Sequence, residues 1–269
     1  MSYYLQDMSW DEIQQTLKRT DTVIIPLGNL EQHGPHCPVG SCYYLAHEAS
    51  KIIGFKTQIP VTPIISFGIS NPYKNFPGSL NISTNTFNNL VKEVSLALVH
   101  HGFKRIIFLS AHGGGNIPTL QRVSEELREE TGALCAVIHL WGLLGQLSPE
   151  ITTAPGETEG HGGDPDTSVM LYLKPELVDM TKATWVPLKA PIEGLTPISH
   201  STHRFRNINI SIPLFGEEVS ENGIYGSPMK ASKERGEKMF NTLIDFLVEF
   251  TQHFDKIKLP PIPQDILKK

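Results

Sequence analysis

The sequence is poor in cysteine, in excess basic charge and in long apolar runs. Its 269 residues hold three cysteines, too few for a disulfide framework, so we expect free thiols, some of them available as ligands. Lys and Arg number 23 against 28 Asp and Glu, a net charge of −5, which disfavours nucleic acid or an anionic membrane as a partner. No run reaches the roughly 18 to 20 apolar residues of a membrane span, and the N-terminus lacks a signal-peptide layout. We therefore expect a cytoplasmic protein.

Strand and helix patterns alternate along the chain. Continuous β-branched runs predict strands, and apolar residues at three- and four-residue steps predict helices. The expected strands are residues 22–28, 57–65, 104–109 and 133–140, and the expected helices are 9–19, 41–53, 85–101, 117–131, 167–173 and 230–254. Such alternation favours a mainly parallel sheet covered by helices on both faces.

No repeat and no linker composition divides the chain. At 269 residues and 39% hydrophobic content, it can bury a full core. We predict a single-domain, three-layer α/β/α fold over residues 1–269. Residues 184–213 are irregular, with hairpin strands that decorate the sheet. A proline-rich tail from about residue 258 is expected to pack on the domain surface or on a neighbouring subunit.

Three polar clusters contain the residues best suited to chemistry. They are Glu31-Gln32-His33-Gly34-Pro35-His36, residues 110–116 (SAHGGGN) and residues 161–168 (HGGDPDTS). The first two directly follow predicted strands, and ligands of parallel α/β sheets bind at the carboxyl ends of strands. Glu31 and His33 are two residues apart, a spacing that lets a carboxylate and an imidazole approach one metal ion from the same side. The glycines after His112 let the backbone pass close to a ligand.

These clusters resemble signatures of the creatininase family of metal-dependent amidohydrolases. Residues 26–40 (PLGNLEQHGPHCPVG) match the family's first signature, and residues 112–116 match its His-Gly-Gly-Asn signature with one extra glycine. Residues 161–168 match its His-Ala-Gly-x-x-Glu-Thr-Ser signature, and residues 76–80 and 223–228 resemble two further loops. The resemblance runs from residue 22 to about residue 240.

The resemblance implies a creatininase-like fold and a binuclear site, in which a hydroxide bridging two divalent ions attacks an amide carbonyl. Glu31 and His112 match the ligands of one ion, and His33 with a carboxylate matches those of the other. His161 matches a family histidine beside the metals, which orients or deprotonates the water or protonates the leaving nitrogen. Glu31 and His161 are therefore the expected catalytic residues.

Two positions depart from the family pattern. Cys42 stands where the family has a bridging aspartate, and Asp166 stands where it has a glutamate. A thiolate can also bridge but is softer, and it favours zinc over magnesium or manganese. Alternatively, Cys42 is a small packing residue at a helix start, and Asp166 is a helix N-cap. The expected metal ligands are Glu31, His33, Cys42, His112 and Asp166, around two divalent ions, with zinc favoured and manganese or iron as alternatives.

The function expected from the resemblance is hydrolysis of a C–N bond in a small cyclic amide or a formamide-like substrate, by a homo-oligomer of which a hexamer is one known family form. One alternative is a degenerate member that binds a ligand or partner without hydrolysis, because of Cys42 and the extra glycine. Another is hydrolysis of a C–C bond or a lactone, since a metal-bound hydroxide attacks other electrophiles. His36 is expected to support a metal ligand, and His200 and His203 to face a neighbouring subunit's site.

Overall fold

Three parallel strands form the main sheet of the computed structural model, which describes residues 3–147 and 160–262. The strands are β1 (Thr22–Leu27), β2 (Arg105–Ser110) and β3 (Leu134–His139), in the order β1-β2-β3. Leu27, Ser110 and His139 are in register at their carboxyl ends. The carboxyl ends of all three strands therefore lie at one end of the sheet, where loops with polar residues follow β1 and β2 and the helix α5 (Leu140–Leu147) follows β3 directly.

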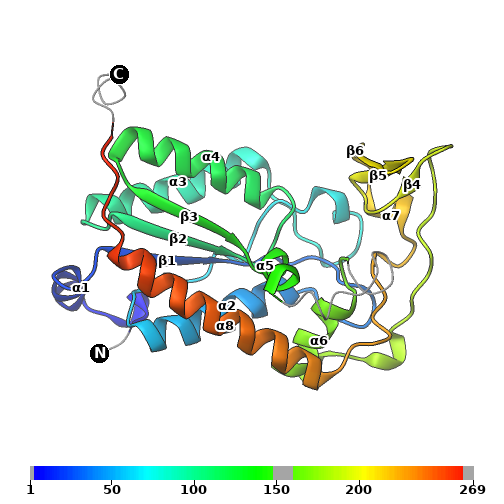
Figure 1. Ribbon diagram of the computed structural model, residues 1–269, viewed down its shortest axis with the longest axis horizontal. Coiled ribbons are helices and arrows are strands. Elements are labelled where there is room, and N and C mark those ends of the chain that lie inside the picture. Colours follow the sequence, from blue (N-terminus) through cyan, green and yellow to red (C-terminus); the bar gives the residue numbers. More distant parts are fainter. Residues whose placement is uncertain (1–2, 148–159, 263–269) are drawn as a thin grey trace.

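Helices cover both faces of this sheet (Figure 1). The helices α3 (Thr84–His100) and α4 (Asn116–Thr131) lie on one face, and α2 (Ser41–Thr57) and α8 (Lys233–Lys256) lie on the other. Successive side chains of a strand point to opposite faces, so Ile106 and Phe108 of β2 join the core under α3 and α4, whereas Ile107 and Leu109 join the core toward α2 and α8. The predicted three-layer α/β/α fold is confirmed.

The predicted strand at residues 57–65 is wrong as a strand, although the segment is extended beside β1. The N–H of Ile24 donates to the carbonyl of Pro60 (2.8 Å), and the N–H of Ile65 donates to the carbonyl of Pro26 (3.0 Å). Only isolated bridges form at Val61 and Ile65. Prolines at positions 60 and 63 have no N–H to donate, so a continuous ladder cannot form.

The other predicted elements are present, with ends shifted by a few residues. The remaining helices are α1 (Trp10–Leu17), α5 (Leu140–Leu147), α6 (Asp164–Leu173), α7 (Gly216–Val219), and the 3₁₀ helices η1 (Leu5–Asp7), η2 (Asn71–Tyr73), η3 (Pro175–Leu177) and η4 (Met180–Lys182). Neither α5 nor α7 was expected. The irregular segment contains β4 (Thr196–Pro197), β5 (Thr202–Phe205) and β6 (Ile208–Ser211), which form a separate antiparallel sheet. Residues 259–262 lie against the end of α4, where Arg128 donates to the carbonyl of Pro260.

The helix α6 is attached to α8 by a buried charge. The Asp164 carboxylate is fully buried and accepts hydrogen bonds from Arg235 of α8 and from Ser168 of its own helix. Close by, the backbone of Gly236 touches the Ser168 carbonyl so closely that no Cβ fits between them. This contact fixes the position of α6, which begins three residues after His161.

Asp164→Ala is expected to lower the free energy of unfolding by about 2 kcal/mol, because it removes the buried carboxylate that accepts from Arg235 and Ser168. Breaking a fully buried pair costs roughly 3–5 kcal/mol, but Arg235 is a third exposed and water compensates part of the loss. Urea denaturation measures the change. Asp245→Ala in α8 is the control, since Asp245 is exposed and pairs only loosely with Lys56 at 3.7 Å; a change within about 0.5 kcal/mol is expected there. Equal losses in the two variants would contradict this account.

Candidate metal centre

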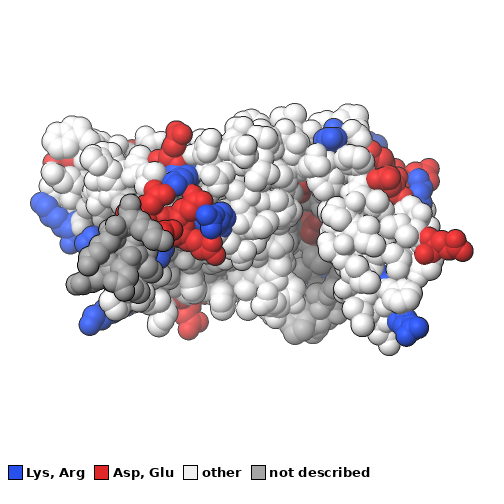
Figure 2. Space-filling model, turned by 90° about the horizontal axis from the view of Figure 1, so that it is seen from above, with Lys and Arg blue, Asp and Glu red and all other residues white. Residues whose placement is uncertain are grey.

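A cavity of about 480 Å³ lies at the carboxyl ends of β1, β2 and β3. Figure 2 shows the molecule hollowed between the part that holds the main sheet and the part that holds β4 to β6. The wall of the cavity includes Glu31 and His33 after β1, His112 after β2, and His139 at the end of β3. The cavity thus occupies the place where parallel α/β sheets bind ligands.

Glu31 is the common point of the polar contacts in this cavity. Its carboxylate is buried, and its Oε1 lies 2.7 Å from Nδ1 of His112. Its Oε2 accepts a hydrogen bond of 2.6 Å from the Ser70 hydroxyl, and the Sγ of Cys42 lies 3.5 Å from Oε1. One carboxylate therefore connects residues that are far apart in the sequence.

Backbone carbonyls hold one nitrogen of each of three histidine rings. His112 Nε2 lies 2.8 Å from the carbonyl of Ile69, His33 Nδ1 lies 3.0 Å from the carbonyl of Glu31, and His161 Nε2 lies 2.5 Å from the carbonyl of Gln32. A carbonyl only accepts, so each of these ring nitrogens must carry the proton. The second nitrogen of His33 and of His161 then faces Glu31, and Nδ1 of His112 lies against the Glu31 carboxylate. Metal-binding histidines are usually oriented in this way, with one ring nitrogen held by the protein.

Five of the side chains form two groups that share Glu31. Potential ligand atoms of Glu31, Cys42 and His112 lie within 4.8 Å of one another, and so do those of Glu31, His33 and His161. The structure therefore brings together four of the five predicted ligands, and places His161 beside them. The fifth, Asp166, lies with its Oδ2 4.0 Å from His33 Nε2.

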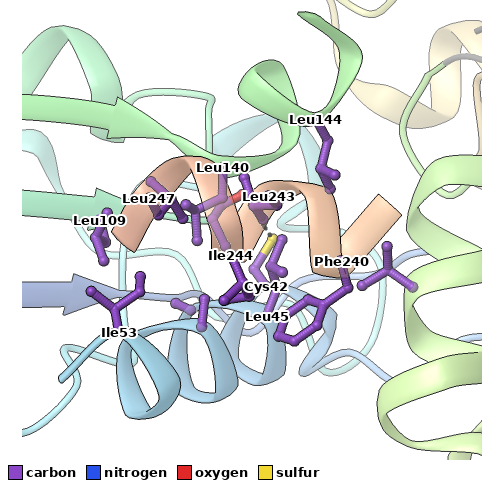
Figure 3. Close-up of a cluster of buried hydrophobic side chains, with 14 of the residues drawn as sticks. Cys42, Leu45, Ile53, Leu109, Leu140, Leu144, Phe240, Leu243, Ile244 and Leu247 are labelled. Carbon is purple, nitrogen blue, oxygen red and sulfur yellow. Dashed lines mark hydrogen bonds between the residues drawn. The ribbon is translucent and has the colours of Figure 1, made fainter. Parts of the chain in front are cut away.

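Asp166 and Cys42 each have a partner in the protein. Asp166 accepts a hydrogen bond of 2.8 Å from the N–H of Gly162. The N-cap residue of α6 is Gly163, so the N-cap alternative for Asp166 is wrong. Cys42 Sγ accepts from the Trp141 indole N–H at 3.5 Å and lies 3.6 Å from His33 Nε2. Cys42 also belongs to a hydrophobic cluster with Leu45, Phe240 and Ile244, shown in Figure 3, so it packs as a small apolar residue while its sulfur faces Glu31 and His33.

Burial and neighbouring charges set the protonation of these groups. Burial raises the pKa of Glu31, but the adjacent His112 outweighs it, so the pKa of Glu31 lies below its usual value. Burial lowers the pKa of His112, but the Glu31 carboxylate outweighs it and the pKa is raised. Burial, followed by His33, lowers the pKa of His161 to about 3. Burial raises the pKa of Asp166 to about 6, and burial with the Glu31 carboxylate raises the pKa of Cys42 well above its usual value. At neutral pH the site thus contains the charged carboxylate of Glu31 beside the neutral imidazole of His161.

Two histidine expectations need correction. His200 lines this chain's own cavity, where its ring meets that of Tyr73 edge-on at 5.5 Å between centroids. It was expected to face a neighbouring subunit because nothing in the sequence shows that residues 196–211 fold back toward β1. His203 is fully buried within the chain. His36 lies with Nε2 2.8 Å from the Thr167 hydroxyl and so supports α6 rather than a metal ligand.

Sequence reasoning missed His139 and Trp141, which line the cavity, and Ser70, whose hydroxyl donates to Glu31. His139 ends β3 and lines the cavity, so the strand-end rule that selected Glu31 and His112 would have found it if applied to the third strand. Trp141 and Ser70 carry no local motif. They reach the site because α5 and the loop before η2 pack over it.

A family model described as creatinine amidohydrolase matches residues 6–251. Among curated proteins, the chain is 26% identical over 229 residues to the mycofactocin precursor peptide peptidase of Mycolicibacterium smegmatis, covering 83% of this chain and 81% of that protein. It is 25% identical over 274 residues to the 3-dehydro-scyllo-inosose hydrolase of Thermotoga maritima, covering 96% and 86%. It is 23% identical over 265 residues to the creatinine amidohydrolase of Pseudomonas putida, covering 92% and 95%.

Solved creatininase structures share the fold. A mutant creatininase of Zn–Zn type and a creatininase with Mn each superpose with a TM-score of 0.75 at 21% identity, covering 96% of this chain and all of the other. A mutant creatininase complexed with creatine gives 0.74 at the same identity and coverage. Within the described residues, no helix has both the length and the apolar character needed to span a membrane.

Proposed function

Because the chain belongs to the creatininase family, we propose that it is a metal-dependent hydrolase that opens a C–N bond of a small cyclic amide or a formamide-like substrate. The observation that carries the proposal is the pair of ligand groups around Glu31 at the floor of a cavity large enough for a small molecule. The relatives named as hydrolases support hydrolysis. The relative named as a peptidase keeps a peptide-like bond among the candidates.

The donor set fits divalent metal ions. Glu31 supplies a charged carboxylate, and His33 and His112 each have one nitrogen held by a backbone carbonyl and the other directed at the group. Imidazole rings oriented in this way and carboxylates are the usual ligands of zinc. We propose two ions held by Glu31, His33, Cys42, His112 and Asp166. Zinc is favoured because of the Cys42 sulfur, while manganese or iron would suit a set in which Cys42 only packs.

Bound divalent ions supply Lewis-acid polarisation of the substrate carbonyl and lower the pKa of an attached water. The protein's own residues orient the ligands, transfer the proton and enclose the substrate. Ser70 donates to Glu31 and keeps that carboxylate turned toward His112. His161 is held by the Gln32 carbonyl, which leaves its Nδ1 as the nitrogen that takes a proton from water and returns it to the leaving nitrogen. Trp141 and His200 close the cavity walls around the substrate.

A second candidate is a ligand-binding protein without hydrolysis. The packing of Cys42 within the hydrophobic cluster favours it, because a thiol that serves only the core would leave the metal ions without their bridge. The single-domain organisation, the homo-oligomer and the cytoplasmic location stay predictions.

Metal content separates these candidates. Protein purified without added metal is expected to carry close to two zinc ions per chain by elemental analysis, and His33→Ala to lose at least one. Cys42→Asp is expected to keep two ions and to accept manganese more readily, since a carboxylate is a harder ligand. Cys135→Ser, on the opposite side of the sheet, is the control and should match the native chain.

One ion or none in the native chain, restored to two by Cys42→Asp, would favour the non-hydrolytic candidate. No ion in any variant, even after incubation with zinc, would exclude the metal-dependent hydrolase. A panel of lactams, hydantoins and formamides then tests turnover, which His33→Ala should abolish.

A further inference from the structure

The imidazole of His139 lies in a slot between two glycines. A Cβ added to Gly113 would lie 2.8 Å from Cε1 and 2.9 Å from Nε2 of this ring, and a Cβ added to Gly142 would lie 2.7 Å from its Nδ1. Neither glycine has a positive φ, so the backbone conformation does not require glycine at either position. Glycine is required at both positions because the His139 ring occupies the space that a Cβ would take.

This slot has an energetic cost. Gly142 lies inside α5, where alanine would favour the helix by about 1 kcal/mol. A histidine kept only for packing would use its ring nitrogens in hydrogen bonds, as buried polar groups usually do. Among the described residues, neither nitrogen of His139 has a hydrogen-bond partner, and neither is fully enclosed by protein. The ring lines the cavity with both nitrogens available to a ligand.

The order of the sheet shows which part of a ligand His139 can reach. Glu31 and His33 follow β1, His112 follows β2, and His139 ends β3. His139 is therefore at the far end of the row from His33, with His112 between them. A substrate whose reacting carbonyl lies over Glu31 and His112 would bring its opposite edge toward β3.

The charge of the cavity restricts the chemistry of that edge. The described lining contains no Lys and no Arg. A carboxylate or phosphate at this end would find no cationic side chain in the wall, whereas an imidazole with one donor and one acceptor suits an uncharged carbonyl or N–H group.

We propose that His139 is a substrate-binding, specificity-determining residue that recognises an uncharged carbonyl or N–H group on the edge of the substrate remote from the hydrolysed bond. The glycines Gly113 and Gly142 hold its ring in place. The position of this group relative to the hydrolysed bond rests on the proposed function, whereas the binding role of His139 does not.

The affinities of two five-membered cyclic amides, hydantoin and 2-pyrrolidinone, measured by calorimetry, test this role. Hydantoin has a second carbonyl and a second N–H that 2-pyrrolidinone lacks. The native protein is expected to bind hydantoin about tenfold more tightly, the size of one well-formed hydrogen-bonding contact. His139→Phe keeps a ring in the slot without nitrogens and should bring hydantoin down to the affinity of 2-pyrrolidinone. His139→Gln, which keeps a donor and an acceptor, should restore part of the preference.

His100→Phe, at the exposed end of α3, is the control and should behave like the native chain. If His139→Phe does not fold, His139→Ala replaces it with the same expectation. The proposal is overturned if the native protein does not prefer hydantoin, if His139→Phe weakens both compounds equally, or if it keeps the full preference.

Each titration is run with zinc-loaded and metal-free protein, alongside a measurement of zinc content. Loss of zinc in His139→Phe would make His139 part of the metal centre and also overturn the proposal. Absence of zinc from the native chain defeats the proposed function alone, because the hydantoin preference can still be measured in the metal-free protein.

Discussion

Glu31→Gln is expected to lower the affinity for zinc by at least about a thousandfold and to abolish hydrolysis. Glu31 is common to both ligand groups, so its loss affects both ions, and even changing a residue that merely supports a ligand costs roughly 10- to 100-fold. The amide of glutamine has nearly the same shape but no negative charge to offer a cation. Titration with zinc against a competing chelator measures the affinity.

Glu193→Gln provides the matched control, because Glu193 is exposed, lies in the irregular segment and is not among the described residues that line the cavity. It should bind zinc as the native chain does. Circular dichroism confirms that both variants are folded. Tight binding of stoichiometric zinc by Glu31→Gln would mean that the zinc ions bind at a site that does not include Glu31.

Gly236→Ala is expected to destabilise the protein by about 4 kcal/mol or more. The new Cβ would overlap the Ser168 carbonyl, which belongs to the backbone of α6 and cannot turn aside. Overpacking by a single methyl group usually costs about 1–3 kcal/mol when side chains can adjust; here two helices must separate. Urea denaturation gives the free energy of unfolding.

Gly145→Ala in α5 is the control for this substitution. A Cβ at Gly145 meets no atom within 4 Å, so only the helix propensity changes, and the variant is expected to be more stable by up to about 1 kcal/mol. The same substitution should thus have opposite signs in two helices. A loss below about 1 kcal/mol in Gly236→Ala would show that α6 and α8 move apart easily.

Most of the fold could be predicted from local patterns. The apolar run of β1 and the periodicity of α3 and α8 depend on residues close in sequence, and their positions are confirmed. The predictions were wrong where a local pattern competes with another effect. Residues 57–65 have strand-like composition, but two prolines interrupt the ladder. The helix α5 is short and contains two glycines, and it forms because it packs against β3 and α8.

The residues of the candidate site also fall into those that a local pattern predicts and those that it does not. Glu31, His33, His112 and His161 lie in compact motifs, and the structure brings them together. Ser70 contacts Glu31 and His200 lines the cavity, and both come from segments without any motif. Their place depends on how distant loops fold over the sheet, which no local pattern contains.

The backbone carbonyls that hold His33, His112 and His161 have a consequence for mutational robustness. A carbonyl is present whatever side chain a residue bears, so substitutions at Ile69 and Gln32 leave the acceptor in place. The proton on each ring nitrogen that faces one of these carbonyls therefore does not depend on the side chain of the residue that supplies the carbonyl. Substitutions in the cavity wall can therefore change which substrates fit while the backbone keeps the orientation of the three rings.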